Sequence, residues 1–129
     1  MNDLVGFIEA RLDEDERIAR RCDGADECGR WTAAGTVVDF CQVEMEGFHP
    51  ALAEHIARHD PARVMREVQA KRRVLARHCL SPAEGDPERP WDDYDDCQYD
   101  SDEWPCPDLL DLAMAYDWHP DYDETWRLA

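Results

Sequence analysis

The pattern of apolar and polar positions at the start of the chain predicts an amphipathic helix over residues 3 to about 21. Apolar side chains recur every three or four residues, which places them on one face of a helix, and charged residues occupy the other faces. The positions of this apolar face are Leu4, Phe7, Ile8, Leu12 and Ile18. Residues 22–29 contain two glycines and short acidic side chains that favour turns, so we expect the helix to end before them.

After residue 30 the pattern becomes one that is typical of strands. Residues 31–38 and 40–43 are rich in aromatic and β-branched side chains, and they predict two short strands or a hairpin. Helical spacing returns at Pro50, with Leu52 and Ile56 about one turn apart. We therefore expect a small β element followed by the first of two central helices.

The second central helix is expected from Pro61 to about Cys79. Asp60 is suited to cap a helix, and proline fits the first helical position while it keeps the preceding residue out of the helical region. The apolar face of this helix is Val64, Met65, Val68, Leu75 and Cys79. The rest of its surface is mainly basic, with Arg63, Arg66, Lys71, Arg72, Arg73 and Arg77.

The last third of the chain combines prolines, acids and aromatic residues. Residues 81–105 contain several prolines and no sustained period, so they predict a loop. Most of the tryptophans and all of the tyrosines lie beyond residue 90; because disordered acidic chains are usually poor in aromatic residues, we expect this segment to pack on a surface. Pro107 and Pro120 predict the starts of a short helix and of a last turn that ends near Trp126.

Together these elements predict an α+β fold that is mainly α, in a single domain of residues 1–129. The N-terminal helix, the small β-hairpin and the two central helices would form a core within residues 1–80. The acidic, Trp- and Tyr-rich segment 81–129 would fold back on that core.

The negative charge of the chain is concentrated in the same C-terminal segment. The formal net charge is -17; residues 1–80 hold 15 acids and 12 bases, whereas residues 81–129 hold 16 acids and 2 bases. Direct nucleic-acid binding is not expected, because it relies on cationic side chains. A basic protein partner, a metal ion or the basic helix of residues 61–79 is favoured instead.

The location of the protein decides how its six cysteines are interpreted. The chain starts without a basic region ahead of its first apolar residues, and no stretch approaches the roughly 20 apolar residues that a membrane span needs. We therefore expect a cytoplasmic protein without membrane contact. In a reducing cytosol the cysteines would be free thiols or metal ligands, and disulfides are not expected.

The most specific chemical pattern is a set of four residues with zinc-binding side chains around the predicted loop. They are His78, Cys79, Cys97 and Cys106. A structural zinc ion takes four nitrogen and sulfur ligands in a tetrahedral array, and such an ion would close a loop that lacks other support. The chain has no close Cys-x-x-Cys pair; in the alternative interpretation the set comprises a core cysteine, a helix-end histidine and ordinary free thiols.

Two further groups of potential metal ligands are weaker. Cys22, Cys28 and Cys41 lack a fourth local cysteine and the tight spacing of iron–sulfur sites, so we expect them to be buried as small apolar side chains. His55 and His59 are four residues apart on a predicted helix and could share a metal ion. The glutamate of a His-Glu-x-x-His metalloprotease is absent, which favours exposed or helix-capping histidines.

Acidic residues form a dense cluster ahead of the C-terminal helix. They are Asp92, Asp93, Asp95, Asp96, Asp100, Asp102 and Glu103. Their order does not fit an EF-hand calcium loop. Two uses remain: docking on the basic helix of the same chain, or presenting a phosphate-like array of charges to a nucleic-acid-binding protein.

Several stretches of the chain, taken in order, resemble a known family. These are residues 3–15 (DLVGFIEARLDED), 55–64 (HIARHDPARV), 70–73 (AKRR) and 119–122 (HPDY), followed by Trp126. They are similar to a family of small uncharacterised proteins of actinobacteria, notably streptomycetes, and of their phages. The resemblance implies a shared fold and origin and brings no established activity. If relatives have a second cysteine three residues after the position of Cys97, this chain has Asp100 there instead. Asp100, Cys79 or a histidine would then have to complete the ligand set.

The function expected from these observations is binding. No nucleophile elbow, Walker loop or dinucleotide-binding glycine pattern occurs, so we expect no enzyme. The first hypothesis is a binding or regulatory protein of unknown target with a structural zinc site. The resemblance suggests that such a protein could be encoded by a phage. The alternatives are an acidic nucleic-acid mimic that inhibits a DNA- or RNA-binding host protein, and a small metal-dependent hydrolase or nuclease built on His55 and His59.

Overall fold

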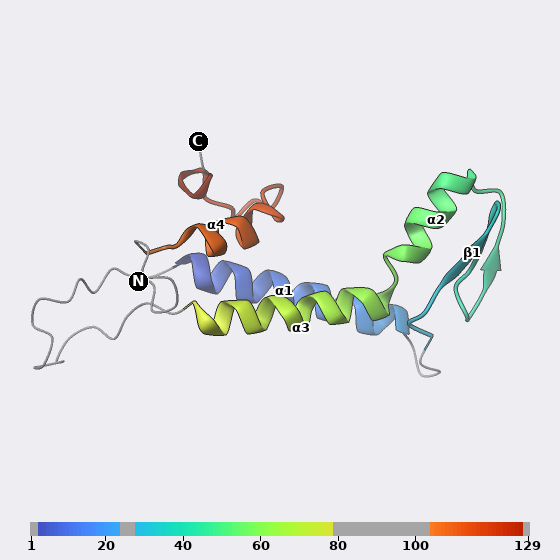
Figure 1. Cartoon of the computed structure of the whole chain (residues 1–129), viewed down its shortest axis with the longest axis horizontal. Helices are drawn as coiled ribbons and strands as arrows, with labels where there is room; N and C mark the ends of the chain where they lie inside the picture. Colours follow the sequence, from blue (N-terminus) through green and yellow to red (C-terminus); the bar gives the residue numbers. More distant parts are fainter. Residues whose placement is uncertain (1–2, 24–27, 79–103, 128–129) are drawn as a thin grey trace, which may run out of the picture. The chain divides into compact units, whose positions relative to one another are not determined.

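The computed structural model describes residues 3–23, 28–78 and 104–127. In this part of the chain it contains four α-helices, a short 3-10 helix and a small three-stranded sheet (Figure 1). The predicted class, α+β and mainly α, is confirmed. The chain forms two compact units, of which unit 1 comprises residues 1–11 and 71–129 and unit 2 comprises residues 12–70. A single domain over residues 1–129 stays a prediction.

Unit 2 is built around the small sheet. Its elements are residues 12–23 of α1 (Asp3–Asp23), β1 (Thr32–Ala34), β2 (Val37–Asp39), β3 (Glu44–Met45), α2 (Pro50–Arg58) and residues 61–70 of α3 (Pro61–Arg77). The strands are antiparallel in the order β1-β2-β3, with Val38 opposite both Ala33 and Met45. Helix α2 contacts β1 and β2 (Figure 1), and the side chains of Val38 and Ala53 are fully buried.

The strand boundaries differ from those predicted. Residues 31–38 were expected to form one strand, but they contain β1, a turn at Gly35 and Thr36, and the start of β2. Gly35 has a φ of 59°, a left-handed conformation that glycine adopts without steric cost, and it reverses the chain there. The predicted hairpin is therefore present, but it lies earlier in the sequence, and β3 adds a third strand after it.

A disulfide bond joins Cys28 and Cys41, whose Cα atoms are 5.2 Å apart. The expectation that all cysteines are free thiols or metal ligands is wrong for this pair. The β1–β2 hairpin lies between the two cysteines and brings its own ends together, which is a relationship that their spacing alone does not reveal. Cys28 is buried as expected, whereas Cys22 and Cys41 are exposed, so the expectation of burial is wrong for these two.

Helix α3 begins where the sequence predicts. The carboxylate of Asp60 accepts hydrogen bonds from the backbone N–H of Arg63 at 2.8 Å and of Trp31 at 3.1 Å. The first bond satisfies an otherwise unpaired amide of the first helical turn, as expected for a capping aspartate. The backbone N–H of Ala62 donates to the carbonyl of Gly29. The start of α3 is thus held both by its own cap and by the segment before β1.

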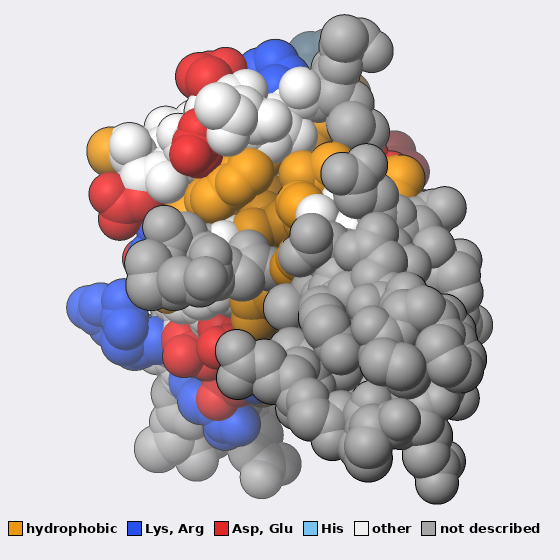
Figure 2. Space-filling model, turned by 90° about the vertical axis from the view of Figure 1, so that its left-hand side faces the viewer, with side chains coloured by type: hydrophobic (Ala, Val, Ile, Leu, Met, Phe, Trp, Pro, Cys, Tyr) orange, Lys and Arg blue, Asp and Glu red, His pale blue; other side chains and the backbone are white. Residues whose placement is uncertain are grey.

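Unit 1 contains the aromatic C-terminal segment. Its described elements are residues 3–11 of α1, residues 71–77 of α3, α4 (Pro107–Met114) and the 3-10 helix η1 (Glu124–Trp126). The ring of Phe7 lies 5.1–6.5 Å, between centroids, from the rings of Tyr116, Tyr122 and Trp126. These contacts confirm, for the described part of the C-terminal segment, that it packs against the start of α1. Figure 2 shows apolar side chains gathered together on the face in view, with acidic and basic side chains beside them.

The buried faces of the helices agree with the predicted ones only in part. Leu4, Ile8 and Leu12 are at most 1% exposed, but Ile18 is 55% exposed. The buried residue near it is Ala19, and successive residues point about 100° apart around a helix. In α2 the predicted apolar position Leu52 is likewise exposed, and its neighbour Ala53 is buried instead. None of the described helices combines the length and the apolar character that crossing a membrane requires.

Candidate functional site

Two of the four predicted metal ligands, His78 and Cys106, lie in contact in unit 1. The Sγ atom of Cys106 is 3.3 Å from Nδ1 of His78. His78 is 3% exposed and Cys106 is fully buried. The other two predicted ligands, Cys79 and Cys97, lie outside the described residues. The fold therefore brings together, across 28 positions of sequence, a thiol and an imidazole that were singled out by residue type alone.

Both side chains are fixed at the ends of helices. His78 follows the last residue of α3, and its backbone N–H donates to the carbonyl of Val74. Cys106 is the residue that precedes the first turn of α4; its carbonyl accepts from the amides of Leu109 and Leu110, and Pro107 occupies the first helical position. The end of α3 and the start of α4 thus place the imidazole and the thiol next to each other.

Asp108 adds a third group, which sequence reasoning missed. Its Oδ2 atom lies 3.4 Å from Nε2 of His78, on the opposite side of the ring from Cys106. An ionised carboxylate only accepts hydrogen bonds. Asp108 therefore favours the tautomer of His78 in which Nε2 carries the proton and Nδ1 presents a lone pair toward Cys106. The one signal in the sequence is the acidic residue two positions after Cys106, in the first turn of a predicted helix.

The distance between Sγ and Nδ1 is close to the distance between two ligand atoms of one zinc ion. With Zn–S of about 2.3 Å and Zn–N of about 2.0–2.1 Å, tetrahedral ligands lie about 3.5 Å apart. A metal-bound histidine usually donates its second ring N–H to a carboxylate or a carbonyl, which is the place that Asp108 takes. Within the described residues no group of three or more His, Cys, Asp or Glu side chains is arranged to hold a metal ion.

The same three groups also have the order of a thiol nucleophile, a base and an orienting carboxylate. That chemistry requires a substrate carbonyl or similar centre to reach the sulfur. Because Cys106 is fully buried, its Sγ offers no surface to a substrate in this conformation. Burial favours the role of a structural ligand over that of a nucleophile.

The predicted partner-binding acids lie outside the described residues. They are Asp92, Asp93, Asp95, Asp96, Asp100, Asp102 and Glu103. Whether they dock on α3 or face a partner therefore stays a prediction. The iron–sulfur interpretation of the N-terminal cysteines is excluded by the disulfide, which occupies Cys28 and Cys41.

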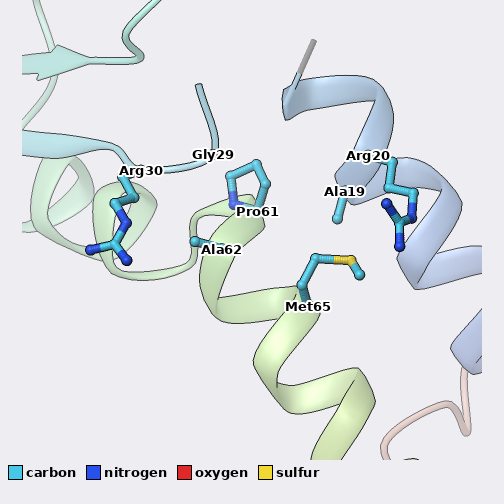
Figure 3. Close-up of a pocket in the computed structure, with 7 residues that line it drawn as sticks. All are labelled: Ala19, Arg20, Gly29, Arg30, Pro61, Ala62 and Met65. Atoms are coloured by element: carbon cyan, nitrogen blue, oxygen red, sulfur yellow. The ribbon is translucent and has the colours of Figure 1, made fainter. Parts of the chain in front are cut away.

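A cleft of about 300 Å³ in unit 2 lies between α1 and the start of α3 (Figure 3). It is lined by Ala19, Arg20, Gly29, Arg30, Pro61, Ala62 and Met65. Pro61 and Ala62 separate the two arginines in the close-up, and Nε of Arg20 donates to the carboxylate of Glu16 at 3.0 Å. The guanidinium groups therefore do not converge on one point, and the cleft lacks the set of convergent polar groups that fixes a ligand.

An exposed cluster of charges surrounds η1. Arg127 donates from Nε to Glu124 at 2.9 Å and from Nη1 to Asp117 at 3.1 Å. The hydrogen bond from Arg127 lowers the pKa of Glu124, and bonds from the backbone and then the side chain of Thr125 lower the pKa of Asp123. The pKa of Arg127 is raised in turn by Glu124 and Asp117. These ion pairs are exposed and screened by solvent, so they order the chain end more than they stabilise the fold.

Comparison with known proteins places the chain in one family. No curated protein and no solved structure matches the sequence. A family of unknown function, DUF6221, matches residues 1–128, which is nearly the whole chain. This agrees with the predicted resemblance to a family without an established activity. The chain is therefore a member of the family of unknown function DUF6221.

Proposed function

We propose that the protein is a non-enzymatic binding or regulatory protein whose C-terminal segment is closed by a structural zinc ion. His78 and Cys106 would be two of the ligands, and Cys79 and Cys97 would complete the set that the sequence predicts. The observation that carries the proposal is the buried contact between His78 and Cys106, with Asp108 at the far ring nitrogen.

Burial supports a metal more than it supports an ordinary thiol–imidazole contact. Imidazole nitrogen and thiolate sulfur are the ligands that a structural zinc ion takes, and both groups are buried here. A zinc ion would use the same lone pair and the thiolate in strong bonds, and it would tie α3 to α4 across the predicted loop. This closure would give the aromatic residues of unit 1 a fixed place to pack.

The direct test is the zinc content of the full chain, purified without a metal-binding tag. We expect about one zinc ion per chain in the unaltered protein, and we expect Cys106→Ser and His78→Ala each to lose the metal and to unfold at a lower temperature. Cys22→Ser is the matched control, because Cys22 is an exposed free thiol that should retain both properties. An unaltered protein without zinc, whose melting temperature does not change on zinc addition, would exclude the site.

Asp108→Asn tests the arrangement of the ligands. The amide keeps the shape of the side chain but removes the charge that holds the proton on Nε2 of His78. Second-shell changes of this kind usually lower metal affinity by about 10- to 100-fold. Asp111→Asn, on the same helix and exposed, is the control and should leave the affinity unchanged. Equal zinc affinities in the two variants would leave Asp108 without the orienting role.

Alkylation of Cys106 separates the structural role from a catalytic one. A zinc-bound, buried thiolate should resist iodoacetamide in the native protein and react once a chelator removes the metal. A nucleophilic thiol should react quickly in the native protein regardless of the chelator. Mass mapping of the modified peptide reads out the two cases.

Partner binding is proposed from the charge distribution. A net charge of -17, placed mostly beyond residue 80, favours a basic protein as the target, and an acidic mimic of nucleic acid is the second version of this proposal. Binding of a basic partner should weaken steeply as salt is raised, because exposed charges are screened. A partner that is bound equally well at high salt would exclude the mimic.

Location and origin also belong to the proposal. We infer a cytoplasmic protein of actinobacteria or their phages. The disulfide between Cys28 and Cys41 argues against the cytoplasmic location, because such bonds are rare in a reducing cytosol. Trapping thiols in intact cells before lysis tests the inference: a fully oxidised pair in every cellular copy would argue for an oxidising compartment.

A further inference from the structure

We propose that His55 and His59 form a second metal site, a two-imidazole chelate on the surface of α2 for a divalent transition-metal ion such as Ni²⁺ or Cu²⁺. The site lies in unit 2 and does not rest on the zinc proposal for His78 and Cys106. It uses two histidines that the sequence assigned to exposed or capping positions.

The two rings already lie together. His59 is the residue that caps the C-terminal end of α2, and its backbone N–H donates to the carbonyl of His55. The ring centroids of His55 and His59 are 4.2 Å apart, with an angle of 30° between the planes. Two imidazole nitrogens that bind one ion at about 2.0–2.1 Å lie about 3 Å apart. The two rings are therefore close enough to bind one ion once they rotate so that a nitrogen of each faces it.

The structure also fixes which nitrogen of His59 is free to bind. Its Nδ1 atom is 2.7 Å from the backbone carbonyl of His55. Since a carbonyl oxygen only accepts, Nδ1 must carry the proton, and the lone pair of the neutral ring is then on Nε2. A ring oriented by a hydrogen bond from its other nitrogen to a carbonyl is the usual arrangement of a metal-binding histidine.

The chemistry of the site selects the class of ion. Both histidines are exposed, so an ion from solution can reach them, and water would fill the remaining coordination positions. Imidazole nitrogen favours copper, nickel and zinc over magnesium and calcium, and among divalent ions the affinity should rise from Mn²⁺ through Ni²⁺ to Cu²⁺.

The test is a calorimetric titration of the full chain with Ni²⁺, without a histidine tag and in excess Mg²⁺ to occupy carboxylates. His55→Ala removes one ligand but keeps the backbone carbonyl that orients His59. We expect this variant and His59→Ala each to lose at least about tenfold in affinity at one site. The control is His49→Asn, which removes an exposed histidine but keeps a side chain suited to its capping role.

The outcomes separate cleanly. Loss of one Ni²⁺ site in both alanine variants and its retention in His49→Asn would support the chelate. Equal stoichiometry and affinity in all four proteins would overturn it, as would complete displacement of Ni²⁺ by Mg²⁺. Circular dichroism confirms that each variant is folded, which we expect because both side chains are exposed.

Discussion

Arg11 and His119 are 108 residues apart in sequence and meet inside unit 1, where Nη1 of Arg11 lies close to Nε2 of His119 and 2.7 Å from its Nδ1 atom. The backbone N–H of Asp121 donates to this Nδ1 atom. Arg11 is 8% exposed, and its guanidinium lies 5.2 Å from the centre of the Phe7 ring. The hydrogen bond therefore connects the first helix to the end of the chain, and the cation–π contact holds the arginine against Phe7 of its own helix.

Replacing Arg11 by alanine should destabilise the protein by about 1–3 kcal/mol. The change removes the donor to His119 and the contact with Phe7 at the same time. Arg11→Lys should recover only part of the loss, because a lysine lacks the planar group that both contacts use. Urea unfolding measures the difference. Arg20→Ala, at an exposed ion pair with Glu16, should change stability by less than about 1 kcal/mol, and equal losses in the two alanine variants would contradict this account.

Phe7→Ala should cost about 3–5 kcal/mol, the usual range for a buried phenylalanine. The Phe7 ring touches the rings of Tyr116, His119, Tyr122 and Trp126, so its loss leaves a cavity at the centre of the aromatic cluster. Phe7→Leu should cost less because it fills part of the space. A red shift of tryptophan fluorescence in native Phe7→Ala, absent from Phe7→Leu, would place the loss at this cluster. Unchanged unfolding midpoints in both would contradict it.

Helix starts were predictable because local chemistry decides them. Pro61 and Pro107 both suit the first helical position, Asp60 adds a capping side chain before Pro61, and both helices begin at these prolines. The buried side of a helix depends on what lies opposite to it in space. This is why Ile18, which was assigned to the apolar face of its helix, is exposed. Leu52, whose spacing predicted the helix that begins at Pro50, is also exposed.

The candidate site, like the helices, was predictable only in part. Residue type singled out His78 and Cys106, but the role of Asp108 depends on the direction of one ring nitrogen, which no spacing encodes. The disulfide was missed because the expected compartment outweighed the cysteine count. Its two partners meet only after the β1–β2 hairpin has formed between them.

Removing the disulfide should destabilise unit 2. Cys28 and Cys41 are separated by 13 positions. Closing a loop of about this length lowers the entropy of the unfolded chain and so stabilises the folded state by about 3 kcal/mol. The double variant Cys28→Ser, Cys41→Ser should therefore unfold at lower urea than the unaltered protein, and a reductant should lower the midpoint of the unaltered protein but not that of the variant. Peptide mapping without reduction should find Cys28 linked to Cys41. Two free thiols at these positions in the native protein would contradict the bond.

The carboxylates at η1 should make the order of the chain end depend on pH. The pKa of Asp123 is lowered from its ordinary value of 3.8 by hydrogen bonds from Thr125, and that of Glu124 is lowered from 4.5 by Arg127. A lowered pKa in the folded state means that the stabilisation is fully present above the ordinary value and is lost as the pH falls through the lowered one. Carboxyl-carbon NMR titration should therefore find both groups titrating below these ordinary values, with η1 losing order over the same range. Arg127→Gln should return the pKa of Glu124 toward 4.5 and leave Asp123 nearly unchanged, because Thr125 still donates to it. If Arg127→Gln shifted both groups equally, a general charge effect, and not these specific hydrogen bonds, would set their pKa values.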